Sequence, residues 1–282
     1  MRRSYHFGAC ETKQNQVSFT KRNKIKQSLK DGKTVVGTMV VEMRTAEIAR
    51  MLGASGFDFI FVDLEHSSYG LETFTDIVLA AKSVGLVCLA RIGDPQYHLI
   101  ARTLDAGAQG LMIPRVETEE TVTNILKFAK YPPWGERGFG VRSIVSNYEN
   151  MPVSDRMVEQ NEDTMIILQI ERKKAVEDIE KLVSVKGVDA AIIGPQDLSI
   201  SLGHPGDHHH PKLMEAVKRV VDACEKCGVA SGLHTANMED MLFWARSGMR
   251  MLTFSSDSAL LQSAASHAVG EIRTAIGGTT KQ

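Results

Sequence analysis

Short apolar runs alternate along the chain with longer segments in which apolar residues recur at helical spacing. From residue 21 onward this alternation repeats eight times, and the short runs are rich in β-branched residues, as buried strands are. They predict strands over residues 34–40, 57–63, 86–91, 110–114, 165–171, 190–194, 229–233 and 251–255. Helices are predicted over residues 45–52, 71–84, 97–106, 117–130, 173–183, 211–227 and 238–247. Glycine stands before most strands, where a left-handed residue ends a helix.

The order of these elements predicts a parallel sheet, because each continuous apolar strand is followed by a helix that can cover it. Eight such units favour a single-domain, TIM-type (β/α)8 barrel, in the α/β class, over an open doubly wound sheet. No Gly-x-Gly-x-x-Gly motif follows the first strand, which weakens the dinucleotide-binding alternative. Residues 131–163 predict a long irregular loop between strands four and five, of the kind that is usually functional or mobile.

The same pattern divides the chain into three parts. Residues 1–20 are polar and mixed in character, and we expect a poorly ordered N-terminal extension there. The barrel covers residues 21–276, and residues 277–282 form a C-terminal tail. Arg2 and Arg3 raise the alternative of organelle import, but Glu11 and the lack of amphipathic spacing favour a simple extension.

Composition excludes several classes of partner. The 282 residues are 43% hydrophobic and 24% charged, which is ordinary for a globular protein. The formal net charge of -1 provides no basic field for nucleic acid or an anionic membrane. No apolar run has the length of a membrane span, and the first residues lack the apolar core of a signal peptide. We therefore expect a cytoplasmic protein.

Four cysteines do not make a disulfide framework in a chain of this length. Cys224 and Cys227 form a Cys-x-x-Cys motif, which raises redox or metal-binding alternatives. The surrounding pattern predicts instead a helix that ends at Gly228 with both thiols in its last turns. Redox motifs of this type usually open a helix, and no second cysteine pair completes a zinc site.

Polar residues gather where the predicted strands end. Barrel enzymes place their active sites at these ends, so one-sided clustering indicates a site. The residues concerned are Asp63, Glu65, His66, Arg91, Arg115, Gln169, Glu171, Gln196, Asp197, His234 and Asn237.

Each of these residues also has a structural interpretation. Asp197 can cap the helix that follows it, and Glu171 can pair with Arg172 or Lys174 on the surface. Arg91 can form a loop salt bridge, and His66 can be an ordinary loop histidine. All of these interpretations would have to hold together at one end of the barrel, which favours a site.

Glu171 and Asp197 indicate a divalent metal. Each follows a strand, and hard carboxylate oxygens on neighbouring rigid strands suit Mg²⁺ or Mn²⁺ with open coordination positions. Gly194-Pro195 turns the chain from strand to helix, so that the amides of Gln196 and Asp197 can bind a small carboxylate or phosphate. His208, His209 and His210 lie in a segment rich in glycine and proline, where a solvated loop is favoured over a metal site.

Five segments resemble the HpcH/HpaI aldolase family, the class II, metal-dependent pyruvate aldolases of the phosphoenolpyruvate/pyruvate barrel superfamily. The resemblance covers about residues 24–275 in the same order and spacing. The segments are residues 57–66, ending in Asp63-Leu-Glu-His66, and residues 104–110, 131–138, 168–171 and 193–199.

The resemblance implies a role for each matching residue. Glu171 and Asp197 would ligate the metal, which is Mg²⁺ or Mn²⁺, with Co²⁺ as an alternative. Gln169, Gln196 and Asp197 would hold pyruvate, and Arg91 would stabilise the enolate oxygen. His66 would be the general base through a bound water. Asp63 and Asp105 would raise the basicity of His66, and the residue at position 105 can come from a neighbouring subunit.

The family also implies a homo-oligomer, either a hexamer or a trimer of dimers. Its last helix often packs on an adjacent protomer, and residues 257–276 are compatible with such an exchange. Leu64 departs from the family, because aldolases with dicarboxylic substrates tend to have Asp-Gly-Glu-His here. Arg115 is a further cation near the site, which either reads an acidic substrate tail or pairs with a loop carboxylate.

The implied reaction is the cleavage of a 4-hydroxy-2-oxo acid to pyruvate and an aldehyde through a pyruvate enolate. The acid would be 4-hydroxy-2-oxoheptanedioate or a 2-keto-3-deoxy sugar acid. Oxaloacetate decarboxylation and citrate-lyase-type acyl-CoA cleavage use related chemistry and are alternatives, as is a non-catalytic barrel. A class I aldolase needs a desolvated lysine, and Lys173 and Lys174 begin a helix outside strand five.

Overall fold

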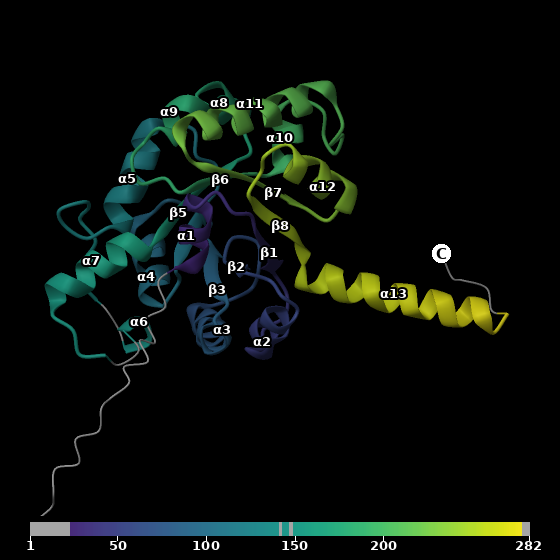
Figure 1. The fold of residues 1–282 in the computed structure, drawn as a ribbon, viewed down its shortest axis with the longest axis horizontal. Coiled ribbons are helices and arrows are strands. Elements are labelled where there is room, and N and C mark those ends of the chain that lie inside the picture. Colours follow the sequence, from purple (N-terminus) through teal and green to yellow (C-terminus); the bar gives the residue numbers. More distant parts are fainter. Residues whose placement is uncertain (1–22, 141–142, 147–148, 278–282) are drawn as a thin grey trace, which may run out of the picture.

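A computed structural model describes residues 23–140, 143–146 and 149–277, and in it eight parallel strands close into one barrel (Figure 1). Each strand pairs with the next along the chain, and β8 pairs back with β1. The strands are β1 Val35–Val40, β2 Phe59–Asp63, β3 Val87–Arg91, β4 Gly110–Ile113, β5 Met165–Ile170, β6 Ala190–Ile193, β7 Ala230–Thr235 and β8 Met251–Ser256. The predicted single-domain (β/α)8 barrel is confirmed, with strand bounds shifted by one or two residues.

Helices alternate with the strands, as predicted, and most of them cover the outside of the barrel. They are α1 Lys24–Lys30, α2 Glu47–Ala54, α3 Leu71–Val84, α4 Tyr97–Asp105, α5 Glu119–Ala129, α6 Ser143–Ser146, α7 Val153–Asp163, α8 Lys173–Glu177, α9 Ile179–Val183, α10 Pro195–Ser201, α11 Pro211–Cys227, α12 Met238–Arg246 and α13 Asp257–Ala275. Gly228 ends α11 in a left-handed conformation, with a φ of 69°. Cys224 and Cys227 therefore end a helix, as predicted.

Apolar side chains form two layers because residues alternate inward and outward along each strand. One layer lies between the strands and the helices, and the other fills the barrel interior with residues such as Phe61, Leu89 and Ile167. Ile25 and Leu29 of α1 join the interior layer, so α1 closes the end of the barrel where the strands begin. The Asn23 side chain caps α1 and donates hydrogen bonds to the carbonyls of Gln109 and Asp163.

The segment 131–163 differs from its prediction. It holds two helices, α6 and α7, rather than one irregular loop. In α7 only Arg156 and Asn161 are buried, so the helix lacks the apolar periodicity that would reveal it in the sequence. The single helix predicted over residues 173–183 is divided into α8 and α9 at Asp178, which accepts hydrogen bonds from Lys174 and Lys181.

Helix α13 leaves the barrel after β8 and projects away from it (Figure 1). Only Asp257, its first residue, is buried; its carboxylate accepts hydrogen bonds from the backbone of residues 41–43 after β1. The extension predicted over residues 1–20 and most of the predicted tail, residues 278–282, lie outside the described residues. In the part of the chain that is described, no helix combines the length and apolar character of a membrane span.

Candidate active site at the carboxyl ends of the strands

A network of opposite charges joins the ends of β2 and β3. Asp63 and Arg91 are register partners, and Arg91 donates two hydrogen bonds to the Asp63 carboxylate, at 2.8 Å from Nε and 2.6 Å from a terminal nitrogen. Burial alone would raise the pKa of Asp63, but the hydrogen bonds and charge of Arg91 outweigh it and lower that pKa. Glu65 lies 3.5 Å from Arg91 Nε and 2.8 Å from Arg115. Both arginines are therefore held by carboxylates.

Glu171 follows β5 and is 5% exposed. One carboxylate oxygen accepts from the backbone N–H of Arg115 at 2.8 Å, and the other accepts from the Gln169 side-chain amide. Burial raises the pKa of Glu171 and the nearby charges of Asp197 and Glu65 raise it further, against these two hydrogen bonds. In the described part of the chain, no Lys, Arg or His side chain forms an ion pair with Glu171. The structural interpretation of Glu171 as a surface ion pair is wrong, since Arg172 pairs with Glu117 and Lys174 with Asp178.

The backbone of Arg115 adopts an unusual conformation and donates a hydrogen bond to Glu171. Arg115 has a φ of 55°, in the left-handed region that residues other than glycine rarely adopt. This conformation accompanies the N–H bond to Glu171, while the guanidinium of the same residue reaches Glu65 and the carbonyl of Gly93. Arg115 was expected either to read an acidic substrate tail or to pair with a loop carboxylate, and in the structure it pairs with Glu65 on the loop after β2. Strained backbone of this kind is concentrated at functional sites.

The turn between β6 and α10 passes directly against Glu171. A Cβ atom added to Gly194 would lie 3.3 Å from Glu171 Oε2 and 3.1 Å from Gln169 Nε2, so a larger residue here would press on both side chains. Pro195 opens α10, and Asp197 stands exposed in its first turn. The structure thus brings Asp197 near enough to Glu171 for its charge to act on that carboxylate.

The donor set at this point fits a divalent cation. Buried Glu171 lies in the negative field of Asp197 and Glu65, and a bound cation would offset that charge. The described residues contain no group of three or more His, Cys, Asp or Glu side chains placed to hold a metal. Two carboxylates that leave further positions to water and substrate are the arrangement in which Mg²⁺ is often bound.

A pocket of about 240 Å³ opens beside these carboxylates. Gln169 lines it with a buried Oε1 atom that has no hydrogen-bond partner among the described residues. His208 also lines it, half-buried on the loop between α10 and α11, with Nε2 at 3.1 Å from Gln196 Oε1. The full lining is Met39, Arg91, Met112, Gln169, Ile192, Ile193, Gly194, Pro195, Gln196, Asp197, His208, His234, Thr235 and Ala236.

His66 lies on the loop after β2, with 68% of its side chain exposed. Its Nε2 atom is 3.7 Å from Glu65 Oε1. The carboxylate of Asp63 holds Arg91 and accepts from the backbone N–H groups of Glu65 and His66, so the structure does not bring it to the His66 side chain. Asp63 positions the loop and the arginine together.

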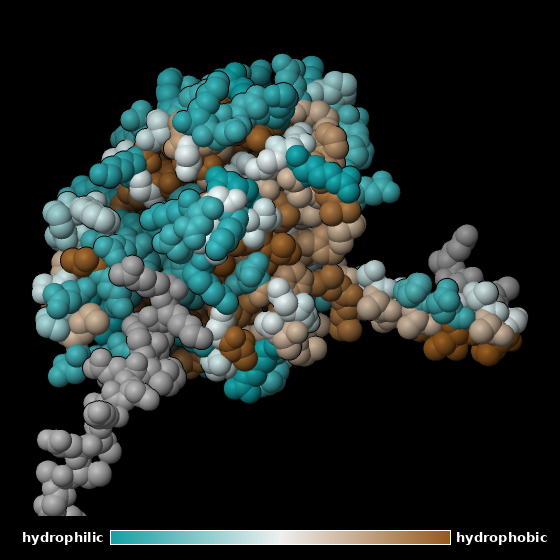
Figure 2. Space-filling view, viewed as in Figure 1, coloured by the Kyte–Doolittle hydropathy of each residue, from teal (hydrophilic) through white to brown (hydrophobic). Residues whose placement is uncertain are grey.

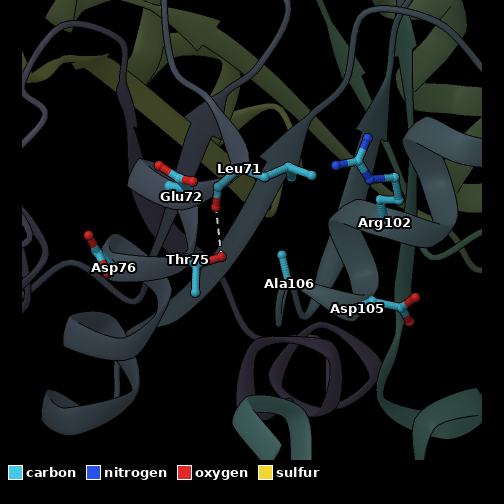
Figure 3. A pocket seen from close by; sticks show the side chains of 7 residues that line it. All are labelled: Leu71, Glu72, Thr75, Asp76, Arg102, Asp105 and Ala106. Carbon is cyan, nitrogen blue, oxygen red and sulfur yellow. Dashed lines mark hydrogen bonds between the residues drawn. The ribbon is translucent and has the colours of Figure 1, made fainter. Parts of the chain in front are cut away.

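Asp105 lies apart from the other predicted residues. It ends α4 five residues before β4 begins, toward the end of the barrel where the strands start. Its carboxylate pairs with Arg137 at 2.5 Å and lines a separate pocket of about 630 Å³ between α3 and α4, with Arg102 and Glu72 (Figure 3). Within one chain Asp105 therefore does not reach the cluster around Glu171.

The lysines considered for a class I mechanism also lie outside the site. Lys173 pairs with Glu177 at 3.6 Å, and Lys174 pairs with Asp178. Neither lines the pocket beside Glu171. Arg91 is the only Lys or Arg side chain among the described residues that does.

Comparison with known proteins agrees with this geometry. The family model for HpcH/HpaI aldolase/citrate lyase matches residues 38–264. A hydroxypyruvate/pyruvate aldolase of Roseobacter denitrificans is 31% identical over 85% of this chain and 93% of its own. A 2-keto-3-deoxy-L-rhamnonate aldolase of Escherichia coli K12 is 30% identical over 74% of this chain and 78% of its own.

A solved structure gives the same result. The HpcH/HpaI aldolase from Desulfitobacterium hafniense DCB-2 superimposes with a TM-score of 0.84 and 39% identity, covering 88% of this chain and 96% of its own. Sequence, fold and the placement of the carboxylates at the strand ends converge on one assignment. The chain belongs to the HpcH/HpaI aldolase/citrate lyase family and is a carbon–carbon lyase of its aldolase type.

Proposed function

We propose that this enzyme cleaves a 4-hydroxy-2-oxo acid to pyruvate and an aldehyde with the help of a divalent metal. The observation that carries the proposal is the buried carboxylate of Glu171, which feels the charge of Asp197, a residue that lines the pocket, and has no ion-pair partner among the described residues. The names of the two relatives support a substrate that yields pyruvate or a close analogue.

Glu171 and Asp197 would hold the ion, which we take to be Mg²⁺ or Mn²⁺, with Co²⁺ as an alternative. When bound, such a cation polarises the oxo group and offsets negative charge that develops on its oxygen. The side-chain amides of Gln169 and Gln196 would orient the oxo acid, because both line the pocket. One atom of each amide is held by a neighbour, Gln169 Nε2 by Glu171 and Gln196 Oε1 by His208, which leaves the other atom for the substrate.

Arg91 and His66 would carry the charge and the proton. Cleavage breaks the bond between C3 and C4, and its electron pair moves toward the C2 oxygen, where the guanidinium of Arg91 can stabilise it. Asp63 holds that guanidinium in place through two hydrogen bonds. His66 would take the proton from the 4-hydroxyl group, and C3 is protonated afterwards to give pyruvate.

A second copy of the chain would complete the site. Asp105 can act only at the barrel mouth of another protomer, since the mouth of its own barrel lies at the opposite end from Asp105. Helix α13 supports the same assembly, because Leu261, Val269 and Ile272 are exposed on a helix that its own barrel does not cover (Figure 2). Apolar side chains are also exposed on the barrel, at Val36, Met51, Met238, Leu242 and Phe243.

Exposed apolar surface of this kind favours packing of α13 onto a partner's barrel, as in a hexamer or a trimer of dimers. Light scattering on the full chain should give an oligomer, and Leu261→Asp with Ile272→Asp should reduce its mass. A wild-type protein that is monomeric at micromolar concentration would contradict the assembly.

Metal removal tests the reaction itself. Pyruvate release from a panel of 4-hydroxy-2-oxo acids and oxaloacetate can be followed by coupling to lactate dehydrogenase. We expect EDTA to abolish release, and Mg²⁺, Mn²⁺ or Co²⁺ to restore it. Full activity in the chelated protein would reject the proposed chemistry, and release from oxaloacetate alone would favour the decarboxylase alternative.

We also place the enzyme in the cytoplasm. Cys88, Cys224 and Cys227 carry free thiols, which is usual where thiols are kept reduced. Cell fractionation with an antibody to the native chain would test this placement.

A further inference from the structure

One wall of the pocket has no role in the proposed chemistry. Arg91, Gln169, Gln196 and Asp197 are assigned to the pyruvate half of the substrate. The rest of the lining consists of an apolar part, with residues such as Met39 and Met112, and a wall on the β7 side. That wall is formed by His208, His234, Thr235 and Ala236.

His234 points into the barrel from the end of β7. It follows Ala230 and Gly232 on the same face of the strand, and Ala230 belongs to the interior layer. Its Nδ1 atom is buried and has no hydrogen-bond partner among the described residues. Burial, with the charge of Arg91, lowers the pKa of His234 to about 4 against the opposing charge of Asp63. The imidazole is therefore neutral near pH 7, with one donor and one acceptor nitrogen.

His208 stands at the rim of the same wall on a braced loop. The rings of His204 and His210 stack with centroids 3.4 Å apart, and His210 Nδ1 caps α11 by accepting from the Lys212 N–H at 3.2 Å. Ser199 Oγ accepts from the Gly206 N–H at 3.0 Å. These contacts fix the backbone on both sides of His208, whose Nε2 meets Gln196.

Nothing on this wall would compensate a second carboxylate. Arg91 is engaged by Asp63 and Glu65, and Arg115 by Glu65 and the Gly93 carbonyl, and Arg115 does not line the pocket. Asp197 lines the pocket itself, and its charge acts on Glu171 together with that of Glu65. A substrate with an acidic tail would bring further negative charge to a region of described residues that holds no uncommitted cation.

We propose that His234 and His208 bind the aldehyde half of the substrate through hydrogen bonds to its hydroxyl groups. The site then takes an uncharged, hydroxylated aldehyde in preference to one that carries a carboxylate. This inference rests on the proposed aldolase function and adds to it the residues that select the aldehyde.

The test runs the reaction in the direction of synthesis with purified full-length protein, Mg²⁺ and pyruvate. The aldehydes compared are glycolaldehyde, lactaldehyde and glyceraldehyde on one side and succinic semialdehyde on the other. We expect kcat/KM to be at least about 10-fold higher for the hydroxylated aldehydes, the range that pocket contacts provide. Equal or better use of succinic semialdehyde would overturn the inference. A cation supplied by a partner subunit would give that result, because it would compensate the carboxylate of this aldehyde.

Variants connect the preference to the residues. His234→Phe removes both ring nitrogens and should raise KM for a hydroxylated aldehyde by about 10- to 100-fold, with a much smaller change in KM for pyruvate. His234→Asn keeps a donor and an acceptor and should recover much of the loss. His208→Ala should raise the same KM less, and His209→Ala, whose side chain is 71% exposed, is the matched control. An effect of His234→Phe no larger than that of His209→Ala would overturn the inference.

Exchange of pyruvate methyl protons with deuterated water separates the two levels of the proposal. This exchange needs only enolate formation, without any aldehyde. Wild-type exchange together with a preference for succinic semialdehyde would overturn the aldehyde assignment alone. If the wild type shows no exchange and no condensation with any aldehyde, the proposed function is overturned, and the inference with it.

Discussion

At the end of the barrel where the strands begin, Lys26 and Asp189 form an ion pair of 3.1 Å with both side chains 12% exposed. Nearby, Lys130 is 4% exposed and donates to the carbonyls of Asn161 and Thr164, at 2.6 and 2.7 Å. At the opposite end, where the strands finish, Glu171 is equally buried, and no Lys, Arg or His in the described part of the chain forms an ion pair with it. The closed end satisfies its charges within the chain, whereas the open end keeps negative charge in excess. Unsatisfied charge lowers stability and is retained where a ligand can use it.

The largest effect should come from Glu171→Gln, which removes the charge that we assign to metal binding. We expect kcat/KM for aldol cleavage to fall by about 10³-fold, as for the loss of a central electrostatic group. The stability of the folded protein should instead increase. Burial and the acidic neighbours raise the pKa of Glu171 in the fold, so its ionisation lowers stability as the pH rises above the pKa of the unfolded chain.

Thermal unfolding of the metal-free proteins at pH 7 should therefore give a higher Tm for Glu171→Gln than for the wild type. Glu177→Gln is the control, since Glu177 is exposed and pairs only with Lys173. A lower Tm for Glu171→Gln would mean that the open end is compensated like the closed one, and the contrast between the two ends would disappear.

Breaking the Asp63–Arg91 pair should affect both activity and stability. Asp63→Asn removes the charge of the buried carboxylate that accepts both hydrogen bonds from Arg91 and leaves the half-buried guanidinium with only Glu65 at 3.5 Å, which costs about 3 kcal/mol in unfolding free energy and should reduce kcat/KM by about 10²-fold. Because the pKa of Asp63 is lowered in the fold, this contribution is present above the pKa of the unfolded chain and is lost as acid protonates the group.

Urea denaturation at pH 7 and pH 4 measures both parts of this expectation. The exposed pair of Lys218 and Asp222, 2.7 Å apart, provides the control, and Asp222→Asn should cost at most about 0.5 kcal/mol. Equal losses in the two variants would show that the network at the open end contributes no more than a surface pair.

The smallest effect concerns the closed end and appears only as a pH dependence. Burial, with the charge of Lys26, lowers the pKa of Lys130 to about 7, so the folded protein binds fewer protons there than the unfolded chain. Stability should therefore increase with pH, and between pH 7 and pH 9 the wild type should gain about 2 kcal/mol relative to Lys130→Met. Urea denaturation at the two pH values measures the difference, with exposed Lys218→Met as the control. Parallel pH profiles for all three proteins would contradict it.

The sequence predicts the barrel because the strands are buried on both faces and therefore read as continuous apolar runs. Leu71–Val84 and Pro211–Cys227 even have the predicted bounds, since Gly85 and Gly228 end them in left-handed conformations. Helix α7 escapes prediction because its surface is nearly all polar. Local pattern thus predicts the elements whose apolar faces are buried and misses those that lie on the surface.

The site was predicted less completely. Strand ends indicate Asp63, Arg91, Gln169 and Glu171, and the structure brings all four to the mouth of the barrel. Glu65 pairs with both arginines, and His208 contacts Gln196. Both roles depend on loop contacts between distant segments, which no local pattern encodes. His234 had a signal, since the inward alternation through Ala230 and Gly232 places it in the pocket. Asp105 lies outside the cluster within one chain, and its role remains part of the proposed assembly.

Residue 115 divides two tasks between different atoms. Its main-chain N–H serves Glu171, and its guanidinium serves Glu65. A mutation at this codon can therefore alter the side chain without releasing the buried carboxylate, unless it introduces proline, which has no N–H. A substitution at this position that keeps the left-handed backbone would therefore change the electrostatic surroundings of the loop after β2 and leave the main-chain bond to Glu171 in place.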